Sequence, residues 1–284
     1  MSEDAGGPFA QGALECIAKL ARQGSHVRIL ALNHLAVQHA KRTADVDAAG
    51  HWLDLHCQEI QGGRSKLGET SYTQLMSRHH RANAFLPQLS RDRAGVIREM
   101  DLCQQYAERM PRTLLEQRIA ADELLFATLE SRTKEALWLG DLDSAEQRAR
   151  RLVDLWPLDP LAHDHLGQVL IERERIEDAL VAYLAAARID APGVESAWFM
   201  AAQCYEALEM PERACDAYLA ALRLDPLGIA SLERLAEVAD DMENPLLAGW
   251  SRTRLADLRS DGATGESRQT LAAYQQYAGQ FGRN

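Results

Sequence analysis

The chain has 284 residues, of which 46% are hydrophobic and 26% charged, and its formal net charge is −11 at pH 7. This composition excludes wholesale disorder, and the acidic excess argues against binding nucleic acid or an anionic membrane through a general field. Aromatic residues make up only 6%, while Ala and Leu dominate, which favours helices over strands.

The cysteines and the first residues bear on the compartment. No window approaches ~18 consecutive apolar residues, so we expect no transmembrane helix. The first eight residues are small and acidic and lack the basic start of a secretory signal. The five cysteines are odd in number, without paired spacing, and are expected to stay reduced. These features together predict a cytoplasmic protein.

The first 110 residues have helical periodicity in a degenerate form. Residues 28–61 predict a helix hairpin, in which Ala48 is the small residue that opens the second helix, followed by Trp52 and Leu55. Residues 62–68 predict a loop. Residues 70–109 predict a longer hairpin, broken near Pro87, with Ala94 at the small position.

Pro111 then opens a long apolar segment through Leu139, and from about Phe126 the sequence repeats every 34–35 residues. A small residue marks the start of the second helix in each unit, and the intervals between these residues are 34, 35 and 34. The four residues are Ala145, Ala179, Ala214 and Ala248. A fixed period of this length is the signature of stacked helix hairpins.

This pattern resembles the tetratricopeptide repeat family over roughly residues 126–260. One unit matches at Leu166, Gly167, Leu170, Ala179, Tyr183, Ala186 and Pro192. The next unit matches at Trp198, Ala201, Ala202, Tyr205, Ala214, Tyr218, Ala221 and Pro226. The resemblance implies an all-α, right-handed superhelical solenoid of antiparallel helix hairpins.

We therefore predict three regions. Residues 9–110 form a degenerate helical-hairpin region, residues 111–260 form the repeat solenoid, and residues 261–284 form a capping helix and tail. The capping helix is expected at 266–278, because a solenoid exposes an apolar face at its end.

Seven of the nine histidines precede residue 81, which raises the question of a metal site. His39, His56 and Cys57 are the candidate ligands, because imidazole and thiolate suit zinc or a similar ion. No pair has the spacing that places ligands on one helix face, so a mixture of core and surface histidines is the preferred interpretation. No phosphate loop or catalytic motif is present, and we expect no cofactor.

The tetratricopeptide resemblance also implies a concave groove lined by the first helix of each repeat. The groove positions hold an apolar strip, eight acidic residues and one basic residue. They include Leu137, Ala207 and Asp241 in addition to the residues expected to bind a partner. The residues expected to bind a partner are Glu130, Lys134, Trp138, Asp164, Gln168, Ile171, Glu172, Phe199, Gln203, Glu206, Glu233, Glu237 and Asp240. Such a groove predicts a basic or amphipathic protein segment as the partner.

Three functions stay open at this point. The first is a non-enzymatic interaction adaptor, and the second is a metal-dependent enzyme, or an enzyme accessory subunit, that uses the histidine-rich half. The third is a transcription regulator acting through protein contacts, because residues 118–188 also resemble the bacterial transcriptional activator domain. Residues 1–110 lack the strands of a winged helix, so we expect no direct nucleic-acid contact. Self-association stays open.

Overall fold

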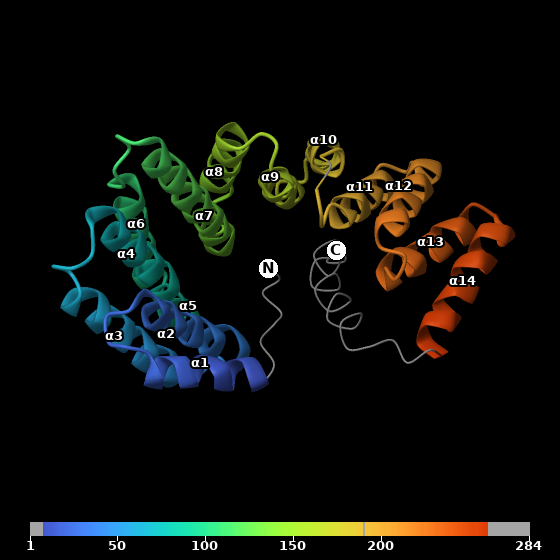
Figure 1. Cartoon of the computed structure of the whole chain (residues 1–284). Coiled ribbons are helices and arrows are strands. Elements are labelled where there is room, and N and C mark those ends of the chain that lie inside the picture. Colours follow the sequence, from blue (N-terminus) through green and yellow to red (C-terminus); the bar gives the residue numbers. More distant parts are fainter. Residues whose placement is uncertain (1–7, 190, 261–284) are drawn as a thin grey trace. The chain divides into compact units, whose positions relative to one another are not determined.

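The computed structural model describes residues 8–189 and 191–260, and all regular secondary structure within these ranges is helical (Figure 1). The prediction of an all-α chain of stacked helix hairpins is therefore confirmed. The described residues divide between Asp141 and Leu142 into two compact units, which are treated separately below. None of the described helices has the length and hydropathy needed to cross a bilayer.

The first unit packs its helices around one central helix. Its elements are α1 (Pro8–Leu20), α2 (His26–Gln38), η1 (His39–Thr43), α3 (Val46–Gly62), α4 (Glu69–Asn83), α5 (Phe85–Leu89), α6 (Arg93–Glu108) and α7 (Leu115–Leu139). Helix α4 contacts α2, α3, α5, α6 and α7, so it links parts of the chain that are distant in sequence. The last helix, α7, ends at Leu139 and is capped by Gly140, whose φ of 77° only glycine adopts without cost.

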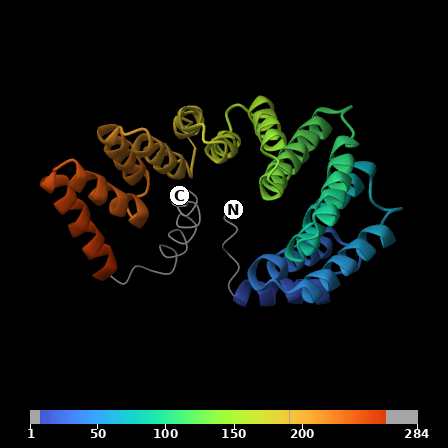
Figure 2. The ribbon, with the colours of Figure 1, turned by 180° about the vertical axis from the view of Figure 1, so that it is seen from behind.

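The second unit stacks its helices in chain order. Its elements are α8 (Leu142–Leu155), α9 (Pro160–Glu172), α10 (Ile176–Ala187), α11 (Glu195–Ala207), α12 (Pro211–Leu224), α13 (Ile229–Asp241) and α14 (Pro245–Ser260). Each helix packs on the next one along the chain, and Figure 2 shows this succession from behind. The main core of this unit is centred on Tyr183, Phe199 and Tyr218.

The small residues that define the repeat are buried at helix contacts. Ala145, Ala179, Ala214 and Ala248 are each at most 1% exposed, as the 34–35-residue period predicts. Short side chains at these positions let neighbouring helices approach closely, which a larger side chain would prevent.

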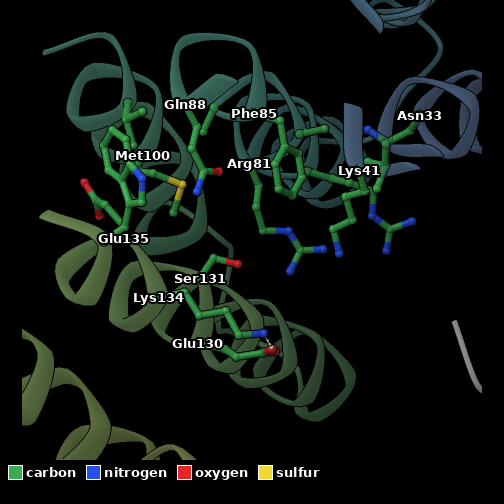
Figure 3. Close-up of a pocket in the computed structure, with 16 residues that line it drawn as sticks. Asn33, Lys41, Arg81, Phe85, Gln88, Met100, Glu130, Ser131, Lys134 and Glu135 are labelled. Carbon is green, nitrogen blue, oxygen red and sulfur yellow. Dashed lines mark hydrogen bonds and ion pairs between the residues drawn. The ribbon is translucent and has the colours of Figure 1, made fainter. Parts of the chain in front are cut away.

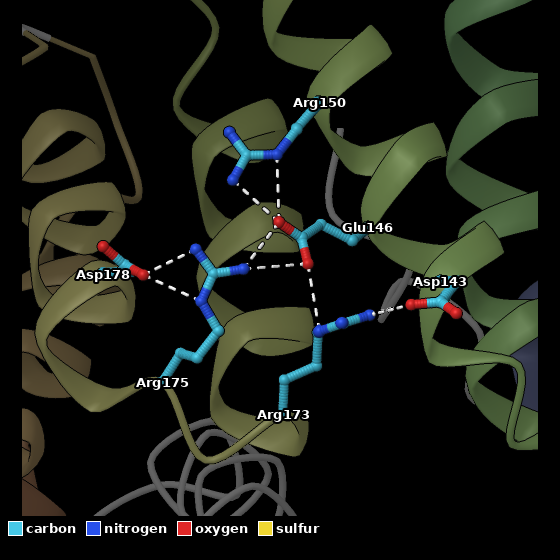
Figure 4. Close-up of polar contacts among 6 residues, drawn as sticks. All are labelled: Asp143, Glu146, Arg150, Arg173, Arg175 and Asp178. Carbon is cyan, nitrogen blue, oxygen red and sulfur yellow. Dashed lines mark hydrogen bonds and ion pairs between the residues drawn. The ribbon is translucent and has the colours of Figure 1, made fainter.

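An ionic cluster ties α8 to the turn between α9 and α10 (Figure 4). The Glu146 carboxylate accepts hydrogen bonds from Arg150 on its own helix, at 2.7 Å, and from Arg175, at 2.8 Å. Arg173 approaches the other carboxylate oxygen at 3.0 Å. Although burial raises the pKa of Glu146, the hydrogen bonds from Arg150 and Arg175 outweigh it and lower the pKa. The cluster therefore holds this carboxylate ionised.

Two expected small positions in the first unit are wrong by one residue. Ala49 is fully buried, whereas Ala48 is only partly covered. Ala94 is exposed, and the buried small residue is Gly95, where a Cβ atom would lie 2.7 Å from the Cβ of Pro87. The capping helix expected at 266–278 lies outside the described residues, and the region boundaries at 110 and 260 stay predictions.

Candidate functional site

A pocket of about 310 Å³ lies within the first unit (Figure 3). We call it the first-unit pocket. Its lining comes from α2, η1, α4, α5, α6 and α7, and the residues used below are Asn33, Lys41, Arg78, Arg81, Phe85, Gln88, Glu130, Ser131, Lys134, Glu135 and Trp138. A cavity of this size suits a side chain or a short segment of a partner.

The lining residues recur at helical spacing because each helix presents one face to the pocket. Helix α7 contributes Glu130, Lys134 and Trp138, which are four residues apart. Helix α2 and the π turn η1 contribute Asn33 and Lys41. Residues four apart lie above one another on a helix, so their side chains converge on the same space.

Ion pairs neutralise both carboxylates of the lining. Lys134 Nζ lies 2.5 Å from Glu130 Oε1. Glu135 pairs with Arg132, with 3.0 Å between Glu135 Oε2 and Arg132 Nη1.

The remaining cations of the pocket make other contacts. Arg81 donates to the backbone carbonyl of Ala127 at 3.3 Å, and Lys41 Nζ lies 5.4 Å from the centroid of the Phe85 ring. Within the described residues, Lys41, Arg78 and Arg81 form no ion pair with a carboxylate. The pocket therefore keeps a positive excess.

Two polar groups of the lining lie in an unfavourable environment. Burial, and then the neighbouring Arg81, lowers the pKa of Arg78. Asn33 is 6% exposed, and its amide Nδ2 has no hydrogen-bond partner among the described atoms. A buried donor without an acceptor is unfavourable, so the site is suited to a group that supplies one.

The partner-binding residues predicted on α7 line the pocket. Glu130, Lys134 and Trp138 do so, and Trp138 also packs against the cluster of Val96 and Met100. Lys41, Arg78 and Arg81 are missing from the sequence prediction, which counted groove positions only from Phe126 onward. The hairpin pattern at 28–61 was an available signal for Lys41. Groove positions lie one, five, eight and nine residues after the first large residue of a repeat, and counting from Leu32 gives 33, 37, 40 and 41, of which Asn33, Val37 and Lys41 line the pocket.

The other ten predicted partner-binding residues lie in the second unit, on three helices. Helix α9 carries Asp164, Gln168, Ile171 and Glu172, helix α11 carries Phe199, Gln203 and Glu206, and helix α13 carries Glu233, Glu237 and Asp240.

Phe199 and Gln203 are corrections to the predicted surface. Phe199 is 2% exposed and packs edge-on against Tyr218, with ring centroids 5.5 Å apart. Gln203 is 9% exposed. Both side chains are buried in the second unit, and Phe199 belongs to its main core together with Tyr218 and Leu235.

The predicted acidic surface stays a prediction, and arginines of the same unit pair with several of its carboxylates. Arg234 pairs with both Glu206 and Glu237. Arg252 pairs with Asp240, and Arg259 lies 2.6 Å from Glu233.

The Glu206 carboxylate has a further partner in Tyr218, whose hydroxyl donates to it. Burial and then the charge of Glu206 raise the pKa of Tyr218. The prediction from groove positions omitted Tyr218, Arg252 and Arg259 because they lie on α12 and α14, the second helices of their repeats, which that count does not include.

The structure does not bring the metal candidates together. His56 is buried on α3, and its Nδ1 lies 3.1 Å from Nδ1 of His79 on α4. His39 lies in the π turn, and Cys57 is partly exposed. Among the described residues no group of three or more His, Cys, Asp or Glu is placed to hold a metal ion.

A comparison with protein families supports the repeat. Residues 195–226, which cover α11 and α12, match the tetratricopeptide repeat model. The match falls on the part of the chain where the sequence pattern is strongest. No curated protein matches the chain.

Solved structures share the fold at low identity. PilF from Pseudomonas aeruginosa is 14% identical, with a TM-score of 0.55 over 86% of this chain and 97% of that chain. MamA from Desulfovibrio magneticus RS-1 is 18% identical, with a TM-score of 0.50 over 66% of this chain and 98% of that chain. Identities this low indicate a shared fold alone.

Proposed function

We propose that this chain is a non-enzymatic protein-interaction adaptor that holds a segment of a partner protein in the first-unit pocket. The observation that carries the proposal is the convergence of side chains from α2, α4 and α7 on one cavity. A tetratricopeptide repeat at 195–226 agrees with such a role.

The histidine-rich half gives less support to the enzyme alternative. His56 and His79 face each other in the core and do not line the pocket. Burial, followed by His79 and Arg78, lowers the pKa of His56 to about 3. A histidine that stays neutral and enclosed in this way packs the core instead of transferring protons to a substrate.

A second candidate function is the binding of a basic or amphipathic segment of a partner protein by the second unit. It is favoured by Glu172 and Glu237, which are exposed at the ends of α9 and α13. A basic partner would have to displace Arg234, Arg252 and Arg259 from their carboxylates, so its binding would be weak and sensitive to salt.

Site-specific photo-crosslinking in extracts of the source organism tests the adaptor role. A photoreactive amino acid replaces Gln88, which lines the pocket, or Gln105, an exposed glutamine on α6 outside it. We expect discrete protein adducts at position 88 and not at position 105. Equal labelling at both positions, or none at 88, would contradict the proposal.

A further inference from the structure

We propose that the first-unit pocket recognises an acidic polypeptide segment, with one carboxylate of the segment bound among Asn33, Arg78 and Arg81. This inference rests on the adaptor role above and specifies the chemistry of its partner.

The charge balance of the pocket is the first step. Its two carboxylates are already paired, Glu130 with Lys134 and Glu135 with Arg132. Arg78, Arg81 and Lys41 therefore face the cavity without a compensating anion from the described residues. In Figure 3 Lys41 and Arg81 extend toward α7, which carries Glu130, Ser131 and Lys134. An anion entering this space meets guanidinium groups that can bind it in a bidentate manner.

The buried amide of Asn33 is the second and independent step. It lines the pocket, it is 6% exposed, and its Nδ2 donor has no partner among the described atoms. A carboxylate accepts from such a donor and from a guanidinium at the same time, because each oxygen has two lone pairs. One bound carboxylate would thus satisfy the buried donor and offset one of the two guanidinium charges.

The rest of the lining favours a polypeptide over other anions. Phe85 and Trp138 give the pocket an apolar side, which fits an aliphatic or aromatic residue next to the acid. A pocket of about 310 Å³ admits one acidic side chain with its neighbour and not the successive phosphates of a nucleic acid. The ligand class is therefore a segment that combines Asp or Glu with an apolar residue, opposite in charge to the partner predicted from the sequence.

The test uses the full chain and a positional-scanning library of fluorescein-labelled octapeptides, read by fluorescence anisotropy. We expect selection of Asp and Glu over Asn and Gln, with an apolar residue beside the acid. Arg78→Gln and Arg81→Gln should each weaken the best peptide at least tenfold. Arg98→Gln, at an exposed arginine of α6 outside the pocket, is the matched control and should have no effect.

Asn33→Asp separates recognition from folding. It places a carboxylate of nearly the same shape inside the pocket, so it should raise the melting temperature while abolishing binding of the acidic peptide. If Arg78 and Arg81 had only a structural role, a rise in melting temperature would not be accompanied by a loss of peptide binding. A variant that melts lower and still binds the peptide would overturn the inference.

The remaining outcomes separate this inference from the adaptor role. Selection of Lys and Arg peptides would overturn the inference and leave the adaptor role intact. Binding of inorganic phosphate, with no peptide of any charge bound, would identify a small-anion site and overturn the polypeptide class. Absence of all peptide binding together with absence of adducts at position 88 would contradict both proposals.

Discussion

At the scale of single residues, the repeat motif depends on contacts that leave no room for one extra atom. A Cβ atom at Gly167 would lie 2.7 Å from the Tyr183 ring, and Tyr183 is 1% exposed. The glycine of α9 thus packs directly against the aromatic ring of α10. The sequence motif pairs them 16 residues apart for this reason.

We expect Gly167→Ala to lower the free energy of unfolding by about 1–3 kcal/mol, because a buried aromatic ring must move to admit the methyl group. Gly249→Ala is the matched control, since a Cβ atom there meets nothing within 4 Å. That change should be neutral or stabilising by up to about 1 kcal/mol, as alanine is the better helix former. Chemical denaturation of both variants measures the difference, and equal stabilities would contradict the contact.

The buried histidine pair makes stability depend on pH. Burial, followed by neighbouring charges, lowers the pKa of His56 to about 3 and that of His79 to about 4. In the unfolded chain both groups take up a proton near pH 6.5. Below pH 6.5 the unfolded state therefore binds more protons than the folded state. The free energy of unfolding falls as the pH decreases from 6.5 toward the pKa values of the two histidines in the folded protein.

Between pH 6.5 and pH 5 the loss should approach about 1.4 kcal/mol per pH unit for each histidine. Arg78 and His80 oppose protonation of the pair, while Asp54 and Glu99 favour it. Denaturation midpoints across this range give the slope. The double variant His56→Asn, His79→Asn should flatten it, whereas His51→Asn, at an exposed histidine of the same helix, should leave it unchanged.

At the scale of helices and turns, a left-handed residue follows the first helix of each hairpin at the repeat period. These residues are Gly140, Glu174, Glu209 and Glu243, with φ between 54° and 77°. Three of the four positions are occupied by glutamate, for which this conformation costs about 1–2 kcal/mol.

Replacing one of these glutamates by glycine should therefore stabilise the protein. Glu209→Gly removes the steric cost, and part of the gain is offset because glycine is more flexible in the unfolded chain. We expect a net rise of up to about 1 kcal/mol, measured as a higher melting temperature. Gln147→Gly, at an exposed position inside α8, should instead cost about 1 kcal/mol. A fall in stability for Glu209→Gly would show that its side chain is needed at the turn.

The same scale explains how far the sequence predicts the fold. The hairpins of the second unit were predictable because Ala179, Ala214 and Ala248 keep a strict period. In α3 the expected residues Ala48, Trp52 and Leu55 are each followed by the position that is more deeply buried, and Ala49, Leu53 and His56 form the inner face. The π turn η1 accounts for the shift, because each of its turns contains more residues than an α-helical turn.

The candidate site was less predictable because charge balance depends on side chains from several helices. Counting acids at groove positions omits Arg234, which neutralises Glu206 and Glu237. It equally omits the fact that Arg78 and Arg81 on α4 line the same pocket as Asn33 on α2. Repeat spacing locates a face of each helix, but it carries no information about which opposite charge reaches that face.

At the scale of the whole molecule, the two units differ in which helices pack against each other. In the second unit packing runs from each helix to the next, as in repeat proteins whose stability is a sum of local terms. In the first unit α4 contacts helices before and after it in the chain, so that unit resembles an ordinary cooperative core. A destabilising substitution should therefore affect only nearby helices in the second unit and the whole core in the first unit.

Hydrogen exchange followed by mass spectrometry tests this difference with one overpacked position in each unit. Ala214→Leu enlarges a fully buried residue of α12, and its effect should be greatest in α11–α13 and should decline toward α9. Gly95→Ala places a methyl group against Pro87, and exchange should then rise together across α2, α4, α6 and α7, since α4 joins these helices. Uniform deprotection of the second unit by Ala214→Leu, or an effect of Gly95→Ala confined to α5 and α6, would contradict this assignment of cooperativity.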